Sequence, residues 1–107
     1  MKPDPANDPV MRRFRNALKA LYGERLERAV LFGSRARGDA RPDSDYDVAV
    51  FLRGYSGLWA ELQPLGAITT EILHDTDAVI SPKPFPEGAY HAHTLLMGEI
   101  RRDGVDL

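Results

Sequence analysis

The chain of 107 residues contains no cysteine, which excludes a disulfide framework and any zinc site built on thiolates. This absence is consistent with a cytoplasmic protein, and we expect that location. No stretch is long and apolar enough to span a membrane, and the N-terminus does not resemble a signal peptide. Internal repeats and low-complexity tracts are also missing. We therefore expect one domain over residues 1–107, with residues 1–8 as a flexible arm.

The chain also has little net charge, because 14 basic and 16 acidic side chains leave a formal charge of −2. A charge this small provides no general attraction to nucleic acid. Aromatic residues make up only 8% of the chain and form no stacking platform of the RNA-binding type. Direct contact with nucleic acid is therefore not expected. Arginines nevertheless concentrate in the first half, as either an anion-facing patch or a solvated surface: Arg12, Arg13, Arg15, Arg25, Arg28, Arg35, Arg37 and Arg41.

Apolar residues at helical spacing predict three main helices. Asp8-Pro9 is typical of a helix start, and a helix is expected over residues 10–22. A second apolar stripe covers residues 58–73. Pro64 interrupts that stripe, which predicts either a kinked helix or two short ones. The last helix is expected over residues 89–102.

Short apolar runs predict three strands, at residues 28–32, 47–52 and 78–81. Prolines occupy every second position after the third run, so this strand should be short and at the edge of a sheet. Strands separated by helices favour an α/β (α+β) domain with a small mixed sheet and helices packed on one face. The other face would then hold the functional site.

The most informative stretch is residues 31–52, which read as strand, glycine turn, loop and strand. Gly33-Ser34 ends the first strand and opens a short helical turn that Gly38 ends, and backbone N–H groups in such a turn suit a phosphate. Asp45 and Asp47 lie at the entry of the next strand, on one face and about 6–7 Å apart along it. Two like charges there repel each other unless a cation lies between them. A phosphate-binding turn facing paired carboxylates suits a nucleoside triphosphate.

This pattern resembles the minimal nucleotidyltransferase (MNT) family of the polymerase-beta-like nucleotidyltransferase superfamily. The residues that carry the resemblance are Gly33-Ser34, Gly38 and Ser44-Asp45-Tyr46-Asp47, at the spacing typical of the family. The resemblance covers most of the chain and implies a mixed sheet of three to four strands with flanking helices. It also implies an enzyme that transfers a nucleoside monophosphate, AMP in particular, from Mg²⁺-bound ATP or another triphosphate to a hydroxyl group.

The resemblance further implies roles for individual residues. Asp45 and Asp47 would act in catalysis and bind Mg²⁺, with two ions about 4 Å apart in such sites. Tyr46 between them points to the opposite face and should pack in the core. The two arginines directly after the glycine turn either neutralise the triphosphate or face a partner. The expected nucleotide-binding residues are Gly33, Ser34, Arg35 and Arg37.

A third carboxylate is the main departure from the family pattern. In active relatives it lies on a later strand and faces the first pair, but the strand predicted at residues 78–81 contains no acid. Asp77 stands just before that strand and is the best replacement, so we predict it as the third catalytic residue. Ser81 is the alternative occupant of that position, and Glu71 and Asp75 lie near the end of the preceding helix. If no acid reaches the site, metal affinity falls and nucleotide binding alone survives.

The resemblance implies a partner as well. Such proteins are commonly encoded with a helical HEPN-domain RNase toxin, act as its antitoxin, and in some cases nucleotidylate a toxin tyrosine. We therefore expect a hetero-oligomer with a HEPN-type toxin and no contact with a membrane. The alternative is a catalytically inactive binding module that neutralises its partner by contact. Leu58 and Trp59 belong to either the core or an interface, and residues 104–107 are a candidate partner edge.

Overall fold

The computed structural model describes residues 4–107. A four-stranded mixed sheet organises the fold, with the strand order β3-β2-β1-β4. Strand β1 runs antiparallel to β2 and β4, whereas β2 runs parallel to β3. The predicted α/β fold with a small mixed sheet is confirmed. In chain order, with η for a 3₁₀ turn, the elements are η1 (Pro5–Asn7), α1 (Pro9–Tyr22), η2 (Gly23–Arg25), β1 (Leu26–Phe32), α2 (Ser34–Arg37), β2 (Tyr46–Leu52), α3 (Leu58–Thr76), β3 (Ile80–Pro86), η3 (Ala89–His91), α4 (Leu95–Asp103) and β4 (Val105–Asp106).

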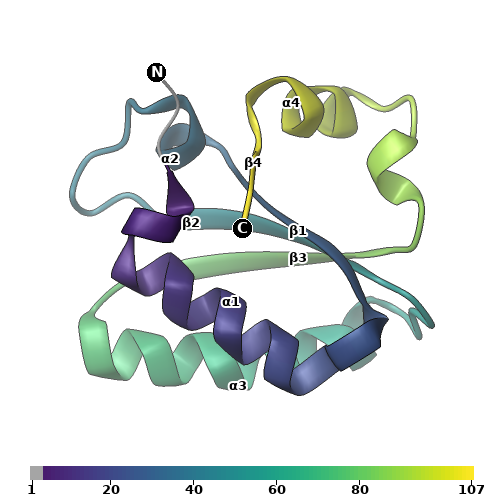
Figure 1. Cartoon of the computed structure of the whole chain (residues 1–107), viewed down its shortest axis with the longest axis horizontal. Coiled ribbons are helices and arrows are strands. Elements are labelled where there is room, and N and C mark those ends of the chain that lie inside the picture. The colour runs from purple at the N-terminus through teal and green to yellow at the C-terminus, as the bar shows by residue number, and fades with distance from the viewer. Residues whose placement is uncertain (1–3) are drawn as a thin grey trace.

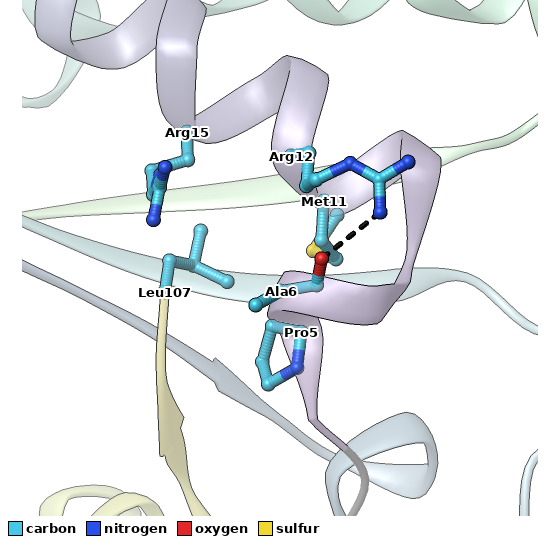
Figure 2. A pocket seen from close by; sticks show the side chains of 6 residues that line it. All are labelled: Pro5, Ala6, Met11, Arg12, Arg15 and Leu107. Carbon is cyan, nitrogen blue, oxygen red and sulfur yellow. Dashed lines mark hydrogen bonds between the residues drawn. The ribbon is translucent and has the colours of Figure 1, made fainter.

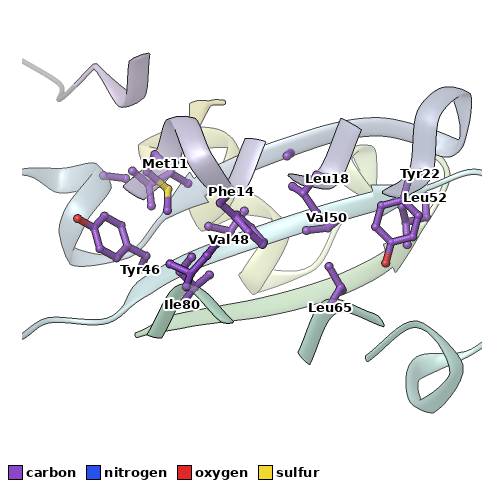
Figure 3. Close-up of a cluster of buried hydrophobic side chains, with 14 residues drawn as sticks. Met11, Phe14, Leu18, Tyr22, Tyr46, Val48, Val50, Leu52, Leu65 and Ile80 are labelled. Atoms are coloured by element: carbon purple, nitrogen blue, oxygen red, sulfur yellow. The ribbon is translucent and has the colours of Figure 1, made fainter. Parts of the chain in front are cut away.

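Helices cover both faces of the sheet, so the prediction that they pack on one face is wrong (Figure 1). Helices α1 and α3 contact each other on one face, and α4 with η3 covers the other. The reason is that alternate residues of β1 and β2 are apolar on both faces, and each apolar face needs a cover. The larger core, between α1, α3 and the sheet, contains Met11, Phe14, Leu18, Tyr22, Ala29, Leu31, Ala36, Tyr46, Val48, Val50, Leu52, Leu65, Ile72 and Ile80 (Figure 3). The smaller core under α4 contains Val30, Phe32, Ala49, Phe51, Met97 and Ile100.

The N-terminal segment predicted as a flexible arm over residues 1–8 contacts α1 in its described part. Its first three residues lie outside the described chain, whereas residues 4–8 form η1 and pack against α1. Asp8 caps α1 by accepting hydrogen bonds from first-turn N–H groups, as predicted. Pro5 is buried, and Arg12 donates to a backbone carbonyl of the segment at 2.9 Å (Figure 2). These contacts join residues 4–8 to α1, and the flexibility expected for residues 1–8 stays a prediction.

Strand β3 is longer than the predicted strand at residues 78–81, because the alternating prolines lie inside it. The Tyr46 N–H donates to the Val79 carbonyl at 2.9 Å, so odd-numbered residues of this segment direct their backbone groups toward β2. The prolines are even-numbered and direct their backbone groups toward the free edge of the sheet. A missing N–H there removes no hydrogen bond between β3 and β2. The edge position is confirmed, and the predicted length is wrong.

The later elements also differ from their predicted bounds. Helix α3 is continuous through Pro64, which excludes two short helices, and its buried Leu65 and Ile72 anchor both halves to the core. The last predicted helix is divided into η3 and α4, because Thr94 caps a new first turn. Residues 104–107, the candidate partner edge, include β4, which pairs with β1 and forms one edge of the sheet, so contact with a partner there stays a prediction.

The structure resolves two alternatives about the surface. Leu58 and Trp59 are 49% and 78% exposed, so they are not core residues. Several arginines of the first half contact acceptors within the chain and do not form a free anion-facing patch: Arg13, Arg25, Arg28 and Arg35. Within residues 4–107, no helix has the length and apolar character needed to cross a bilayer.

Candidate active site

The glycine turn and the carboxylate pair meet where Gly33 contacts Asp47. Strand β1 ends at Phe32, and Gly33 turns the chain with a φ of 75°. A Cβ atom added at Gly33 would lie 2.5 Å from the Asp47 Oδ2 atom, closer than real side chains approach. The Asp47 carboxylate therefore rests on the glycine backbone. Only glycine accommodates both this contact and the positive φ.

The turn after Gly33 presents backbone donors beside this contact. The Gly33 carbonyl accepts hydrogen bonds from the N–H groups of Ala36 and Arg37, each at 3.1 Å, and so closes α2. The N–H groups of Ser34 and Arg35 precede these bonds and, as in any first helical turn, have no partner inside the helix. The predicted helical turn is thus present, with donors beside a carboxylate.

Asp45 and Asp47 lie at the start of β2, toward the face that α4 covers. Asp45 is exposed and Asp47 is half-buried. Burial raises the pKa of the Asp47 carboxyl above its ordinary value; Lys83 and Arg37 lower it, and Asp45 and Glu99 raise it further. The net increase means that the negative charge of Asp47 is not fully compensated by the chain. A bound cation would provide that compensation.

Charged side chains from three other elements surround the pair. The Arg37 Nη1 atom lies 3.7 Å from Glu99 Oε1 of α4, and Arg37 Nε donates to Asp39 at 3.3 Å. Lys83 of β3 donates to the Ser81 Oγ atom at 3.4 Å. The Arg37 side chain is 41% exposed, so its guanidinium is accessible to an anionic ligand. The structure therefore brings the predicted residue Arg37 to the site.

The structure does not bring Arg35 to the carboxylate pair. Its guanidinium donates to the Ser44 carbonyl at 2.8 and 3.0 Å and lies 4.0 Å from the centroid of the Tyr46 ring. Tyr46 is buried in the larger core, as predicted, so Arg35 lies on the opposite face of the sheet from the carboxylates. Arg35 shapes the loop before β2, and its expected role in nucleotide binding is not supported.

Asp77 also lies apart from the carboxylate pair. It ends α3 in the left-handed conformation, with a φ of 62°, and lines a hollow beside the loop before β2. Glu71 and Asp75 instead face Arg13 of α1, at 3.8 and 2.7 Å. Across residues 4–107, no three carboxylate or imidazole side chains gather into a metal-binding group. The expectation that Asp77 completes a three-carboxylate site is therefore not supported.

Lys83 and Glu99 are residues of the site that the sequence reasoning missed. Lys83 lies in the proline-alternating run, which looks like an exit from a short strand. If the strand is extended through this run, the period of two places Lys83 on the same face as Ser81 and Phe85. This alternation in the sequence could have indicated that Lys83 faces the site. Glu99 had no comparable signal, because its position depends on α4 covering the second face.

The oxygen ligands that this site offers fit a hard cation. Carboxylate oxygens are the preferred ligands of Mg²⁺, and such sites are usually completed by water and substrate phosphates. Asp45 and Asp47 would hold the ion, and the uncompensated charge of Asp47 favours it. The backbone donors of α2 and the Arg37 guanidinium stand beside them for the anionic part of a ligand.

Comparisons with known proteins identify the family. The model of the nucleotidyltransferase domain family matches residues 11–93. A Methanocaldococcus jannaschii protein named as a candidate protein adenylyltransferase, MJ0141, is 32% identical over 98 residues, which cover 92% of this chain and 95% of the relative. A second protein of that organism with the same kind of name, MJ0604, is 42% identical over 43 residues, or 40% of this chain and 43% of the relative.

Solved structures share the fold. A toxin–antitoxin complex with AMP-PNP matches with a TM-score of 0.64 at 18% identity, covering 89% of this chain and 69% of that chain. A mutant of the MntA-HpeT toxin–antitoxin matches with a TM-score of 0.63 at 16% identity, with the same coverage. A Sulfolobus solfataricus protein described as a candidate nucleotidyltransferase matches with a TM-score of 0.59 at 20% identity, covering 98% and 87%. At these identities the matches establish the fold.

A small mixed sheet in which a glycine turn supports a carboxylate pair on the next strand defines a domain of the nucleotidyltransferase type. The chain belongs to the nucleotidyltransferase domain family, as the family match and the relative that spans almost the whole chain both show. The resemblance drawn from the sequence is confirmed, and the domain is a nucleotidyltransferase.

Proposed function

We propose that this nucleotidyltransferase binds ATP with Mg²⁺ and transfers AMP to a hydroxyl group of a partner protein, acting in the cytoplasm as the antitoxin of a HEPN-type toxin. The observation that carries the proposal is the contact between Gly33 and Asp47, which joins a phosphate-binding turn to a carboxylate. The relative named as an adenylyltransferase supports AMP transfer and a protein acceptor. The toxin–antitoxin complexes of the same fold support the partner.

Several groups of this chain have roles in the proposed reaction. Asp45 and Asp47 would hold Mg²⁺, which when bound neutralises phosphate charge and stabilises charge that develops at the α-phosphate. The N–H groups at the start of α2 would bind phosphate oxygens, with Ser34 beside them. Arg37 would neutralise further charge from the same face. The acceptor oxygen bonds to the α-phosphorus, the bond to the β-phosphate oxygen breaks, and pyrophosphate leaves while the hydroxyl proton passes to solvent.

The exposure of the site favours an acceptor from a second protein. Asp45 is exposed and Arg37 is partly exposed, so the described residues leave one side of the pair accessible. A hydroxyl carried by a partner can therefore approach the pair directly.

The decisive experiment is transfer of label from α-labelled ATP. The protein is incubated with Mg²⁺ and the product of the neighbouring gene, the proposed HEPN-type partner, and label on that product is expected. The Asp45→Ala/Asp47→Ala variant should abolish labelling. Asp43→Ala, which removes an exposed acid from the same loop, is the matched control and should label normally. A pair that binds ATP but shows no Mg²⁺-dependent labelling would exclude the transfer activity.

A second candidate function is a binding module that neutralises the partner by contact without turnover. The observation that favours it is that no three acids or imidazoles among residues 4–107 form a metal-binding group, together with the positive charge of Lys83 near Asp47. This candidate predicts a stable, neutralised complex that the Asp45→Ala/Asp47→Ala variant still forms. Loss of neutralisation in that variant, with the complex intact, would exclude it.

A further inference from the structure

Lys83 lies on the strand next to the carboxylate pair and on the same face of the sheet. In the parallel pairing of β2 with β3, Asp47 lies opposite Ser81, and Lys83 follows two residues farther along β3. Paired residues share one face of a sheet, and the rings of Phe51 and Phe85 on this face stack with centroids 5.5 Å apart. The Lys83 Nζ atom lies 3.4 Å from the Ser81 Oγ atom. The lysine side chain therefore extends back along β3 toward Asp47.

The charge of Lys83 is not neutralised by an adjacent acid. In the part of the chain that the structure describes, its ammonium has no carboxylate within 4 Å, and its hydrogen bond goes to a neutral hydroxyl. Lys83 is half-buried, and a half-buried ammonium is costly unless negative charge lies nearby. Asp47 lies opposite Ser81, the residue that Lys83 contacts, and so places negative charge on the same face of the sheet.

The same region lacks what a second divalent ion would need. Among residues 4–107, no three carboxylate or imidazole side chains gather into a metal-binding group. Glu99 of α4 also acts on Asp47, but its carboxylate lies 3.7 Å from the Arg37 Nη1 atom, which offsets its charge. The Lys83 ammonium, on the same face as Asp47, repels any additional cation placed there. With Glu99 and Arg37 paired, the two carboxylates and Lys83 have the charge balance for a single divalent ion accompanied by one fixed positive charge.

We propose that Lys83 takes the place of the second metal ion, so that Asp45 and Asp47 hold one divalent ion and the Lys83 ammonium contacts the phosphates of the nucleotide. This proposal rests on the proposed binding of Mg²⁺ with ATP and specifies its stoichiometry. It also gives the chain an electrostatic reason to function without a third acid. Lys83 is then a nucleotide-binding residue on β3.

The test counts bound Mn²⁺ by electron paramagnetic resonance, with and without AMP-PNP. The wild-type chain should bind one Mn²⁺ in the presence of AMP-PNP. Lys83→Met, which keeps most of the side-chain length, should weaken AMP-PNP binding about tenfold and leave the count at one. Lys83→Asp should raise the count to two. Lys19→Met, which removes an exposed ammonium from α1, is the matched control and should behave as wild type.

Two results would overturn the inference while the proposed nucleotide binding stands: two Mn²⁺ per wild-type chain, or normal AMP-PNP affinity in Lys83→Met. If wild type and all variants fail to bind AMP-PNP, the proposed function is overturned and this inference with it. Circular dichroism establishes that each variant is folded. If Lys83→Asp is unfolded, the count and affinity of Lys83→Met decide the question.

Discussion

Gly33 and Asp47 constrain each other more closely than any other pair at the site. The glycine has a positive φ, and the carboxylate occupies the space that a Cβ atom would need. Gly38, five residues later, also has a positive φ, but a Cβ atom there would meet nothing within 4 Å. Alanine substitutions at the two glycines therefore distinguish the cost of backbone strain alone from the cost of strain combined with a steric clash.

We expect Gly33→Ala to destabilise the protein by about 3 kcal/mol and Gly38→Ala by about 1 kcal/mol, because only the first adds a clash to the backbone strain. Urea denaturation measures both. In an Asp47→Ala background, where the contacting oxygen is gone, the two costs should converge. Equal costs in the wild-type background would show that the carboxylate does not rest on Gly33.

Asp47 should also limit stability at neutral pH. Its pKa is raised in the folded state, so the folded chain binds this proton more tightly than the unfolded chain does. By linkage, stability is highest below the unfolded pKa of about 4 and falls as the pH rises through the folded pKa. Asp47→Asn should therefore raise the melting temperature at pH 7 in the presence of a chelator.

The gain from Asp47→Asn should shrink as the pH falls and disappear below the unfolded pKa. Calorimetric melting curves of both proteins from pH 7 to pH 3 measure this difference. Asp43→Asn is the matched variant, since it removes a neighbouring acid from the exposed loop. A gain of constant size at every pH would argue against the titration of Asp47 as its cause.

At the scale of elements, an ion pair with one buried partner joins η2 to the first turn of α3. Arg25 Nη2 lies 2.6 Å from Glu61 Oε2, and the Glu61 side chain is 4% exposed while that of Arg25 is 44% exposed. Glu61 also accepts a hydrogen bond from the Ser56 N–H at 3.2 Å. The pair therefore positions the turn between β2 and α3.

The unequal burial of Arg25 and Glu61 predicts that replacing one partner lowers the stability of the protein more than replacing the other. Arg25→Met leaves a buried carboxylate without its cation and should cost about 3 kcal/mol. Glu61→Gln leaves a guanidinium that water can solvate and should cost about 1 kcal/mol. The double variant should be more stable than Arg25→Met alone, as chemical denaturation will show. A double variant at least as unstable as Arg25→Met would mean that the buried charge is not the cause.

For the whole molecule, β3 forms one edge of the sheet, and its prolines limit the hydrogen bonds that this edge can make. Its prolines direct their backbone nitrogens toward the free edge, so this edge has carbonyl acceptors but few donors. A second chain cannot complete a β ladder on such an edge. The sheet therefore does not extend on that side, and a partner protein is expected to contact other surfaces.

Restoring donors at this edge should promote self-association. We expect Pro82→Thr/Pro86→Thr to raise the apparent mass in light scattering as concentration increases, relative to wild type. Pro42→Thr, in the exposed loop before β2, is the matched control and should not change the apparent mass. If the double variant has the mass of wild type at every concentration, the prolines do not protect the edge.

Local sequence patterns predicted the structure correctly where residues close together in the chain determine it. The start of α1 at Asp8-Pro9, the turn at Gly33-Ser34 and the orientation of Tyr46 all follow from capping, glycine conformation and strand alternation. The extension of β3 through its prolines could not be predicted in the same way, since it depends on which backbone side faces β2. Lys83 was missed for that reason.

The sequence by itself determined the family of this protein, the position of the paired carboxylates and the glycine turn that precedes them, because each depends on residues close together in the chain. Only the tertiary structure decided which distant side chains join them. It placed Lys83 and Glu99 near Asp47, and it left Arg35 and Asp77 elsewhere. The physical reason is that strand order and helix placement follow from burying two apolar faces at once, and that requirement involves the whole chain.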